Sequence, residues 1–190
     1  ETDQVIQTID VDADRQVCDV VKGRDGKFYA VVAGKIDKTA NPFWMWGTTA
    51  TSSASVLTID PQTYATTERT LAIEGLPMVS VGNGLYGCMA CASATSDELF
   101  IKQEGYSATQ IYRYDCQTGK TSVFATTSRS LAKYMTATPD GLLYVPTTDF
   151  YHVYTEVYRI SDGTRMTGVE SRIGKVAGDG GIVSTYSFAE

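Results

Sequence analysis

The sequence predicts an all-β fold. Three observations predict it: a repeated turn-and-strand pattern, a composition rich in Tyr, Thr and Val, and almost no helical periodicity. Aromatic and β-branched side chains favour strands because they pack well on a pleated surface. The chain has 190 residues, of which 43% are hydrophobic and 20% charged, and this is typical of one globular domain with its own core.

Three copies of one pattern follow each other along the chain. Each copy opens with a glycine turn, continues into a short apolar strand, and has a second strand that runs to Asp or Ser before a polar turn. The paired strands occupy residues 25–32 and 55–63, residues 82–89 and 110–120, and residues 139–145 and 156–163. The marker glycines Gly26, Gly84 and Gly141 are 58 and 57 residues apart. A near-fixed period with four short strands per unit is typical of β-propeller blades.

The register of the repeat predicts how the chain is divided. Thr8-Ile9-Asp10 matches Thr58-Ile59-Asp60, so the N-terminus enters at the third strand of a blade, and residues 179–184 match the Asp-Gly strand. We therefore expect three complete four-stranded blades between two complementary half-blades: residues 1–16, 17–73, 74–131, 132–170 and 171–190.

The sequence allows two arrangements of these blades. The two half-blades can join as one shared blade in a closed four-bladed ring, which removes the exposed sheet edges. An open arc would instead leave two apolar sheet faces uncovered. Such a partial ring needs the rest of a longer chain, a second propeller half or a homodimer to complete it.

The extra length of each unit lies between its second and third strands, in residues 33–54, 92–109 and 146–155. In a propeller these connections share one face. Long loops in compact domains are usually functional or disordered. We therefore expect this face to carry the functional surface.

Aromatic residues concentrate in these long connections. Trp and Tyr offer a large contact area with a polar group, which suits stacking on sugars and flat ligands. The predicted ligand-binding residues are Phe43, Trp44, Trp46, Lys102, Tyr106, Tyr151, His152 and Tyr154. The alternative is that a tryptophan folds back as a lid on its own blade.

The signals for chemistry are weak, and no catalytic residue, metal ligand or cofactor is predicted. Cys88 and Cys91 lie on one predicted strand, where they point to opposite faces, so buried thiols are expected rather than a disulfide or zinc site. Residues 10–14 carry three aspartates, but Arg15 stands where a calcium loop needs Gly. These carboxylates are expected on one exposed strand face. His152, the only histidine, has no visible partner for a triad.

The charge balance argues against nucleic acid as a partner. The net charge is −6, and the basic residues are scattered rather than clustered as phosphate binding requires. The longest apolar run is far shorter than the roughly 18 residues of a membrane helix.

The blades resemble those of the YncE-like, YVTN-type bacterial surface-layer propellers. They resemble in particular the C-terminal half of a family of seven-bladed cell-surface propellers of unknown function. The matching stretches are residues 25–32, 56–64, 138–145 and 157–163. The resemblance implies an extracytoplasmic, lipid-anchored protein at the cell surface or in the periplasm, often beside an outer-membrane transporter. It also implies a corrinoid-type or sugar ligand.

Three functional hypotheses follow. The favoured one is a non-enzymatic propeller that captures a small molecule or glycan on the face with the long loops. A protein–protein scaffold at the cell surface is the second. A propeller lyase or dehydrogenase is the third, and it is disfavoured because one histidine offers little for a metal site. Fold alone does not decide among them.

Overall fold

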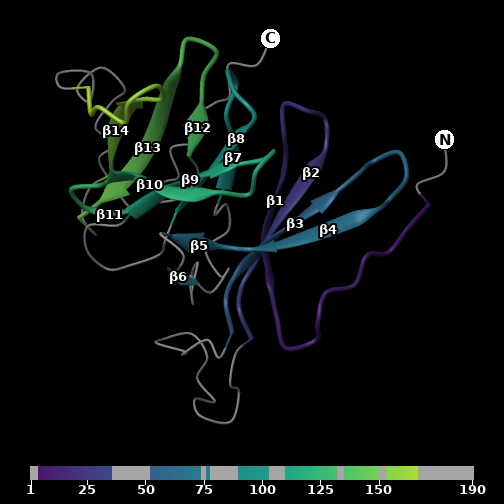
Figure 1. The fold of residues 1–190 in the computed structure, drawn as a ribbon. Coiled ribbons are helices and arrows are strands. Elements are labelled where there is room, and N and C mark those ends of the chain that lie inside the picture. The colour runs from purple at the N-terminus through teal and green to yellow at the C-terminus, as the bar shows by residue number, and fades with distance from the viewer. Residues whose placement is uncertain are drawn as a thin grey trace.

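The computed structural model describes residues 4–35, 52–73, 76–77, 90–102, 110–131, 135–149 and 153–166. Every regular element within these residues is a β-strand, and they form three sheets (Figure 1). The prediction of an all-β fold is confirmed. None of the described residues forms a helix long and apolar enough to cross a membrane.

The first sheet contains four antiparallel strands in chain order, β1-β2-β3-β4. Their bounds are Val17–Lys22, Phe28–Val32, Ser55–Ile59 and Thr66–Thr70. The β1–β2 turn uses Gly26 at φ 83°, a conformation that glycine adopts without a Cβ clash. In the β3–β4 turn, the Asp60 carboxylate accepts the Gln62 backbone N–H at 2.8 Å and ends the strand.

The second sheet repeats this order with β7, β8, β9 and β10, whose bounds are Ala90–Ala92, Glu98–Lys102, Gln110–Asp115 and Thr121–Thr126. Two short strands, β5 (Ala72–Ile73) and β6 (Leu76–Pro77), extend it beyond β10. β5 runs parallel to β10 through the single pair Ile73 and Thr121, and the sequence did not predict this extension.

The assignment of the second copy of the repeat was wrong. Residues 82–89 were predicted to pair with residues 110–120, but the strand that pairs with β9 is β8, which lies within the predicted loop 92–109. The turn before β8 is closed by a bond from the Ser93 N–H to the Glu98 carbonyl. Gly23 with Lys27, and Thr138 with Leu142, close the matching turns of the other two sheets. The observed first turns of the three sheets are therefore not separated by a constant distance near 58 residues.

The third sheet is built on the long hairpin of β13 (Leu142–Thr148) and β14 (Val153–Arg159). The short strands β11 (Ser130–Leu131) and β12 (Thr136–Ala137) pair with successive parts of β13 and together occupy the place of a first strand. A bridge from Tyr158 to Arg165 marks the position of a fourth strand. β13 and β14 extend into the predicted loop 146–155, which is therefore shorter than expected.

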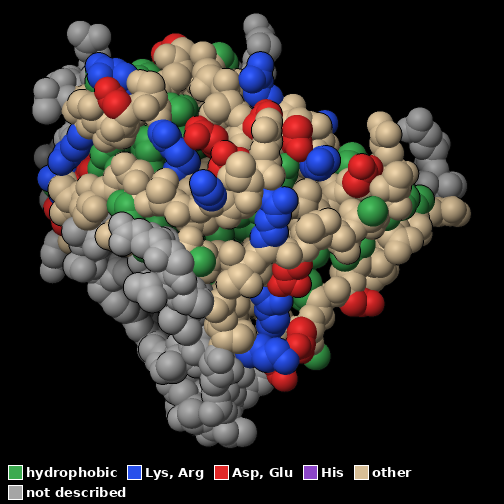
Figure 2. Space-filling model, viewed as in Figure 1, with side chains coloured by type: hydrophobic (Ala, Val, Ile, Leu, Met, Phe, Trp, Pro, Cys, Tyr) green, Lys and Arg blue, Asp and Glu red, His purple; other side chains and the backbone are tan. Residues whose placement is uncertain are grey.

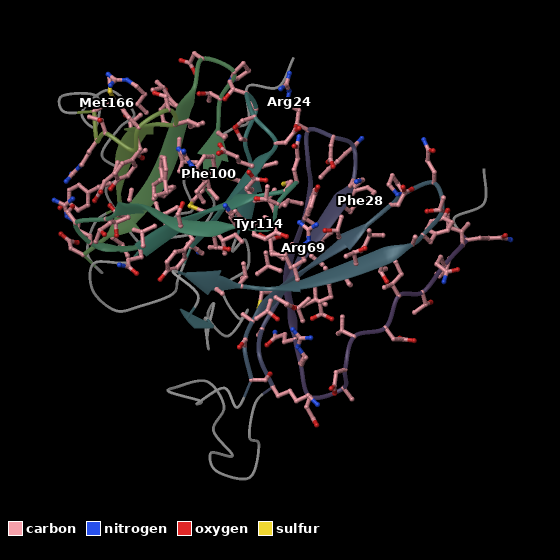
Figure 3. The ribbon with its side chains drawn as sticks, viewed as in Figure 1. Arg24, Phe28, Arg69, Phe100, Tyr114 and Met166 are labelled. Carbon is pink, nitrogen blue, oxygen red and sulfur yellow. The ribbon has the colours of Figure 1, made fainter. Side chains whose placement is uncertain are left out.

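The three sheets stack face to face in chain order. Leu99 and Ile101 of β8 pack on the first sheet in one core cluster, while Phe100, between them, packs on the third sheet in another. This alternation places the second sheet between its neighbours (Figure 3). All three side chains are fully buried, and each contributes about 1.5–3 kcal/mol through removal of apolar surface from water.

The first strands of the sheets lie near one another. The Ala90 N–H of β7 donates to the Asp19 carboxylate of β1 at 2.9 Å, and β7 also contacts β12. The sheets therefore meet along their first strands, while the fourth strands β4 and β10 lie away from this line.

The N-terminal residues 4–16 form no strand, although a strand was predicted at residues 5–10. Ile9 and Val11 pack against the outer face of the first sheet. Asp10, Asp12 and Asp14 are exposed as expected, but around a turn closed by the Arg15 N–H and the Asp12 carbonyl rather than along a strand. The predicted C-terminal half-blade, residues 171–190, lies outside the described residues.

Candidate functional site

The strands of all three sheets end on two opposite sides of the structure. At the hairpin end lie the tight turns 23–27, 60–65, 93–98, 115–120, 138–142 and 159–164. At the other side, named here the loop end, the second strand of each sheet finishes and the third begins: at Val32 and Ser55, at Lys102 and Gln110, and at Thr148 and Val153. The predicted connections 33–54 and 146–155 therefore lie at the loop end, whereas the predicted connection 92–109 also contains the hairpin-end turn 93–98 and β8.

Two of the eight predicted ligand-binding residues lie within the described structure, Lys102 and Tyr154. The other six lie outside the described residues: Phe43, Trp44, Trp46, Tyr106, Tyr151 and His152. Their gathering on one face therefore stays a prediction.

Lys102 is the last residue of β8 and is 2% exposed. Its predicted position in a loop is wrong, because β8 runs through the segment. Lys102 pairs with Ile111, which belongs to the core between the second and third sheets.

Tyr154 lies near the start of β14 and forms a flat polar platform with Arg129 and Asp149. The Arg129 Cζ lies 4.0 Å from the centre of the Tyr154 ring, which is a close cation–π contact. The Tyr154 hydroxyl donates to Asp149 Oδ2 at 2.9 Å. This hydrogen bond raises the pKa of Tyr154, so the ring stays neutral at ordinary pH.

A buried carboxylate, Glu156, adjoins this platform and is 0% exposed. Ser128 donates to it through its backbone N–H at 3.1 Å and its hydroxyl at 2.5 Å, and the Tyr158 hydroxyl donates at 2.6 Å. Arg129 Nη1 and Arg165 Nε lie 3.9 and 3.7 Å from its oxygens. We name Ser128, Arg129, Thr147, Glu156, Tyr158 and Arg165 the Glu156 cluster.

The Glu156 cluster fixes the position of Arg129. A buried carboxylate needs donors and a counter-charge, and the cluster supplies both. Arg129 contacts Glu156 on one side and the Tyr154 ring on another, so its guanidinium is held in place before any ligand arrives. A donor held in this way loses little conformational entropy on binding.

A second set of charges lies at the loop end of the first sheet. Arg15 forms an ion pair with Glu68 and donates through Nε to the Ala33 carbonyl at 3.0 Å. Hydrogen bonds from Ser55 and Arg15 lower the pKa of Glu68. The loop end therefore carries ordered charges of both signs, and Figure 2 shows such mixing over the viewed face.

A groove of about 540 Å³ lies at the opposite, hairpin end, between the second and third sheets. Arg113 lies in it, with its Cζ 4.9 Å from the Phe124 ring and its Nε 3.7 Å from Glu98 Oε1. Arg113 also donates to the Ile160 carbonyl of the third sheet. These contacts occupy Arg113 in joining the two sheets.

The described cysteines are free thiols: Cys18, Cys91 and Cys116. Burial raises the pKa of Cys91 to about 12 and that of Cys116 to about 11, so both stay protonated and unreactive. Cys88 lies outside the described residues. Within the described ranges, no three His, Cys, Asp or Glu side chains are close enough to hold a metal ion.

The sequence analysis did not find Arg129, Asp149 or Glu156. One signal was available for Glu156: it stands between Tyr154 and Tyr158 on the same face of an alternating strand. The matching positions of the other sheets hold Leu57 and Tyr112. A charge at an inward position predicts a buried polar network.

A scan against known protein-family models finds no match for this chain. A search among curated proteins likewise finds no match.

Proposed function

We propose that this chain is an arc of three β-propeller blades, flanked by half-blades and similar to the YncE-like surface propellers. The antiparallel order of each sheet, the face-to-face stacking and the contacts among β1, β7 and β12 support the proposal. The first strands of successive blades line the axis of a propeller, and the contacts of β7 with β1 and with β12 support such an arrangement. A second propeller half or a homodimer covers the exposed ends of the arc.

The function we propose is capture of a small molecule or glycan at the loop end, without catalysis and outside the cytoplasm. The observation that carries it is the Arg129–Tyr154–Asp149 platform, in which a flat ring, a fixed donor and a carboxylate lie together. Such groups bind sugars and flat ligands by stacking and by oriented hydrogen bonds. A corrinoid or a neutral oligosaccharide is the ligand class, and an outer-membrane transporter is the proposed neighbour.

Calorimetric titration with cyanocobalamin and a panel of neutral oligosaccharides tests this function. We expect micromolar binding, weakened roughly tenfold in Tyr154→Phe and more in Arg129→Ala, because each loses about 1.4 kcal/mol or more of contact energy. The variant Trp44→Ala with Trp46→Ala is expected to weaken binding while leaving the melting temperature nearly unchanged.

The matched control is Ser161→Ala, which alters the groove at the opposite end. Binding that persists in the Tyr154 and Arg129 variants, or that is lost in the Ser161 variant, would place the ligand elsewhere. An early-melting tryptophan variant with unchanged affinity per folded molecule would make those residues structural lids.

A further inference from the structure

One face of the first sheet points away from the other two sheets, and we name it the open face. Its residues on β1 to β3 are Val17, Val20, Lys22, Phe28, Ala30, Val32, Ser55, Leu57 and Ile59, and β4 adds Thr66, Glu68 and Thr70. The matching faces of the second and third sheets are each covered by the preceding sheet. The exposed fractions show the difference at one repeat position: Leu99 and Leu143 are 0% exposed, whereas Phe28 is 37% exposed.

The N-terminal residues cover only part of the open face. Ile9 and Val11 pack on Ala30, Val32 and Leu57, which are nearly buried. The remainder is a patch of exposed apolar side chains. Among the described residues, the exposed large hydrophobic side chains of the first sheet and its turns are Val17, Val20, Phe28 and Tyr64. Val5 and Ile6 are also exposed and belong to the N-terminal segment, and Val123 belongs to the second sheet. Concentration of this kind marks an interaction surface on a soluble domain.

A preceding sheet at the spacing seen between the second and third sheets does not fit the open face. Tyr64, Gly119 and Gly163 occupy the same turn position, each with positive φ. A Cβ at Gly163 would lie 2.5 Å from the Phe124 carbonyl oxygen of the preceding fourth strand. Tyr64 carries a full side chain there and is 38% exposed. The occupant therefore approaches differently from a stacked blade.

The charges beside the patch are of both signs. Lys22 lies on the open face next to Phe28, and both it and Asp10 are exposed. Ile9 and Val11 face the sheet, so Asp10, between them, alternates away from it. In a two-fold contact the same surface meets itself, and a surface with both signs can pair Lys22 with Asp10 across the axis.

We propose that the open face binds a second copy of this chain in a two-fold symmetric dimer, centred on Val20 and Phe28. The proposal rests on the proposed blade arrangement, in which the open face is the uncovered end of the arc, and it names a second copy as the occupant of that face. An aromatic side chain at the centre of an apolar patch is the usual anchor of such an interface. The contact leaves the loop end of both copies open.

Sedimentation equilibrium of the isolated chain across a concentration series tests the proposal. We expect a dimer with a micromolar dissociation constant, weakened at least roughly a hundredfold by Phe28→Glu, because that change places a charge at the centre of the patch. Val20→Lys gives a second variant at a more exposed position, and circular dichroism establishes that each variant folds.

The matched control is Val123→Glu, since the exposed fraction of Val123 lies between those of Phe28 and Val20 but Val123 lies on the second sheet. The control is expected to dimerise like the original chain. A chain that stays monomeric at all concentrations overturns the proposal. So does a dimer that survives both open-face substitutions, or one that the Val123 substitution disrupts equally. Ligand titration at the loop end is measured separately, so a failed dimer and a failed binding function give different results.

Discussion

Glu156 is the residue on which the loop end of the third sheet most depends. Its carboxylate is fully buried and accepts hydrogen bonds from Ser128 and Tyr158, with Arg129 and Arg165 beside it. Removing one member of such a buried network leaves its partners without hydrogen bonds, which costs far more than the loss of a surface ion pair.

We predict that Glu156→Ala lowers the free energy of unfolding by about 3 kcal/mol, because several buried donors lose their acceptor. Urea unfolding followed by circular dichroism measures the change. Tyr112→Phe, at the matching position of the second sheet, is the control: it removes a hydroxyl that donates to Gln110, and it should cost about 1 kcal/mol or less. Equal costs for the two variants would contradict the assigned role of Glu156.

Asp60 and Asp115 give the turns at the hairpin end a pH dependence. Backbone N–H groups of the following residues bond each carboxylate and lower the pKa of Asp60 and of Asp115. Because the folded state favours the ionised form, the stabilisation is present above the ordinary Asp pKa of about 4 and is lost as the pH falls through the lowered pKa.

The melting temperature is therefore predicted to fall below about pH 4. Asp60→Asn with Asp115→Asn keeps a side-chain oxygen for the turn but cannot titrate there, so its melting temperature should change less between pH 5 and pH 3. Calorimetric scans at several pH values measure both chains. Identical pH profiles would show that these turns do not contribute to the acid response.

At the scale of elements, the turns at the hairpin end set how closely the sheets approach. Gly26 and Gly163 both have positive φ, but they differ in their surroundings. A Cβ at Gly26 meets no atom within 4 Å, whereas one at Gly163 meets the Phe124 carbonyl oxygen at 2.5 Å. Gly26 is therefore required only by its turn, whereas Gly163 is required both by its turn and by the close packing of the third sheet on the second.

We predict that Gly26→Ala costs about 1–2 kcal/mol, since only the left-handed backbone is strained. Gly163→Ala should cost about 3 kcal/mol or more, because the third sheet must also move away from β10. Chemical unfolding of the two variants compares them directly. If both lose the same free energy, the close approach at Gly163 does not contribute to stability.

The same turns explain what the sequence could predict. Gly26 and Gly141 mark true hairpins, so the strands after them were placed correctly. The second sheet builds its turn without glycine: the Ser93 hydroxyl accepts the Thr95 and Ser96 N–H groups at 3.2 Å each. A serine turn of this kind is harder to recognise in a sequence than a glycine turn, so the prediction placed the first turn of the second unit at Gly84 instead.

The candidate site was harder to predict than the fold. The repeated turn-and-strand pattern predicted strands at residues 139–145 and 156–163, but it did not predict the partners of Tyr154. Asp149 lies only five residues before Tyr154, across the connection between β13 and β14, whereas Arg129 follows β10 of the second sheet. The contact with Arg129 depends on how the sheets stack, and a local pattern does not encode that stacking.

At the scale of the whole molecule, the central claim is that the second sheet lies between the first and the third. The alternation along β8 carries this claim: Leu99 and Ile101 belong to the core with Tyr29 and Val31, whereas Phe100 belongs to the core with Leu143. The proposed propeller arc, the loop end and the open face all depend on this stacking order.

Methyl-detected nuclear Overhauser spectroscopy of the isolated chain tests the stacking most directly. We predict that the Ile101 methyl groups show contacts to Val31 of the first sheet, while the Ile111 methyl groups show contacts to Val145 of the third sheet. Contacts from Ile101 and Ile111 to the same neighbouring sheet, or from Val31 to Val145, would contradict the account.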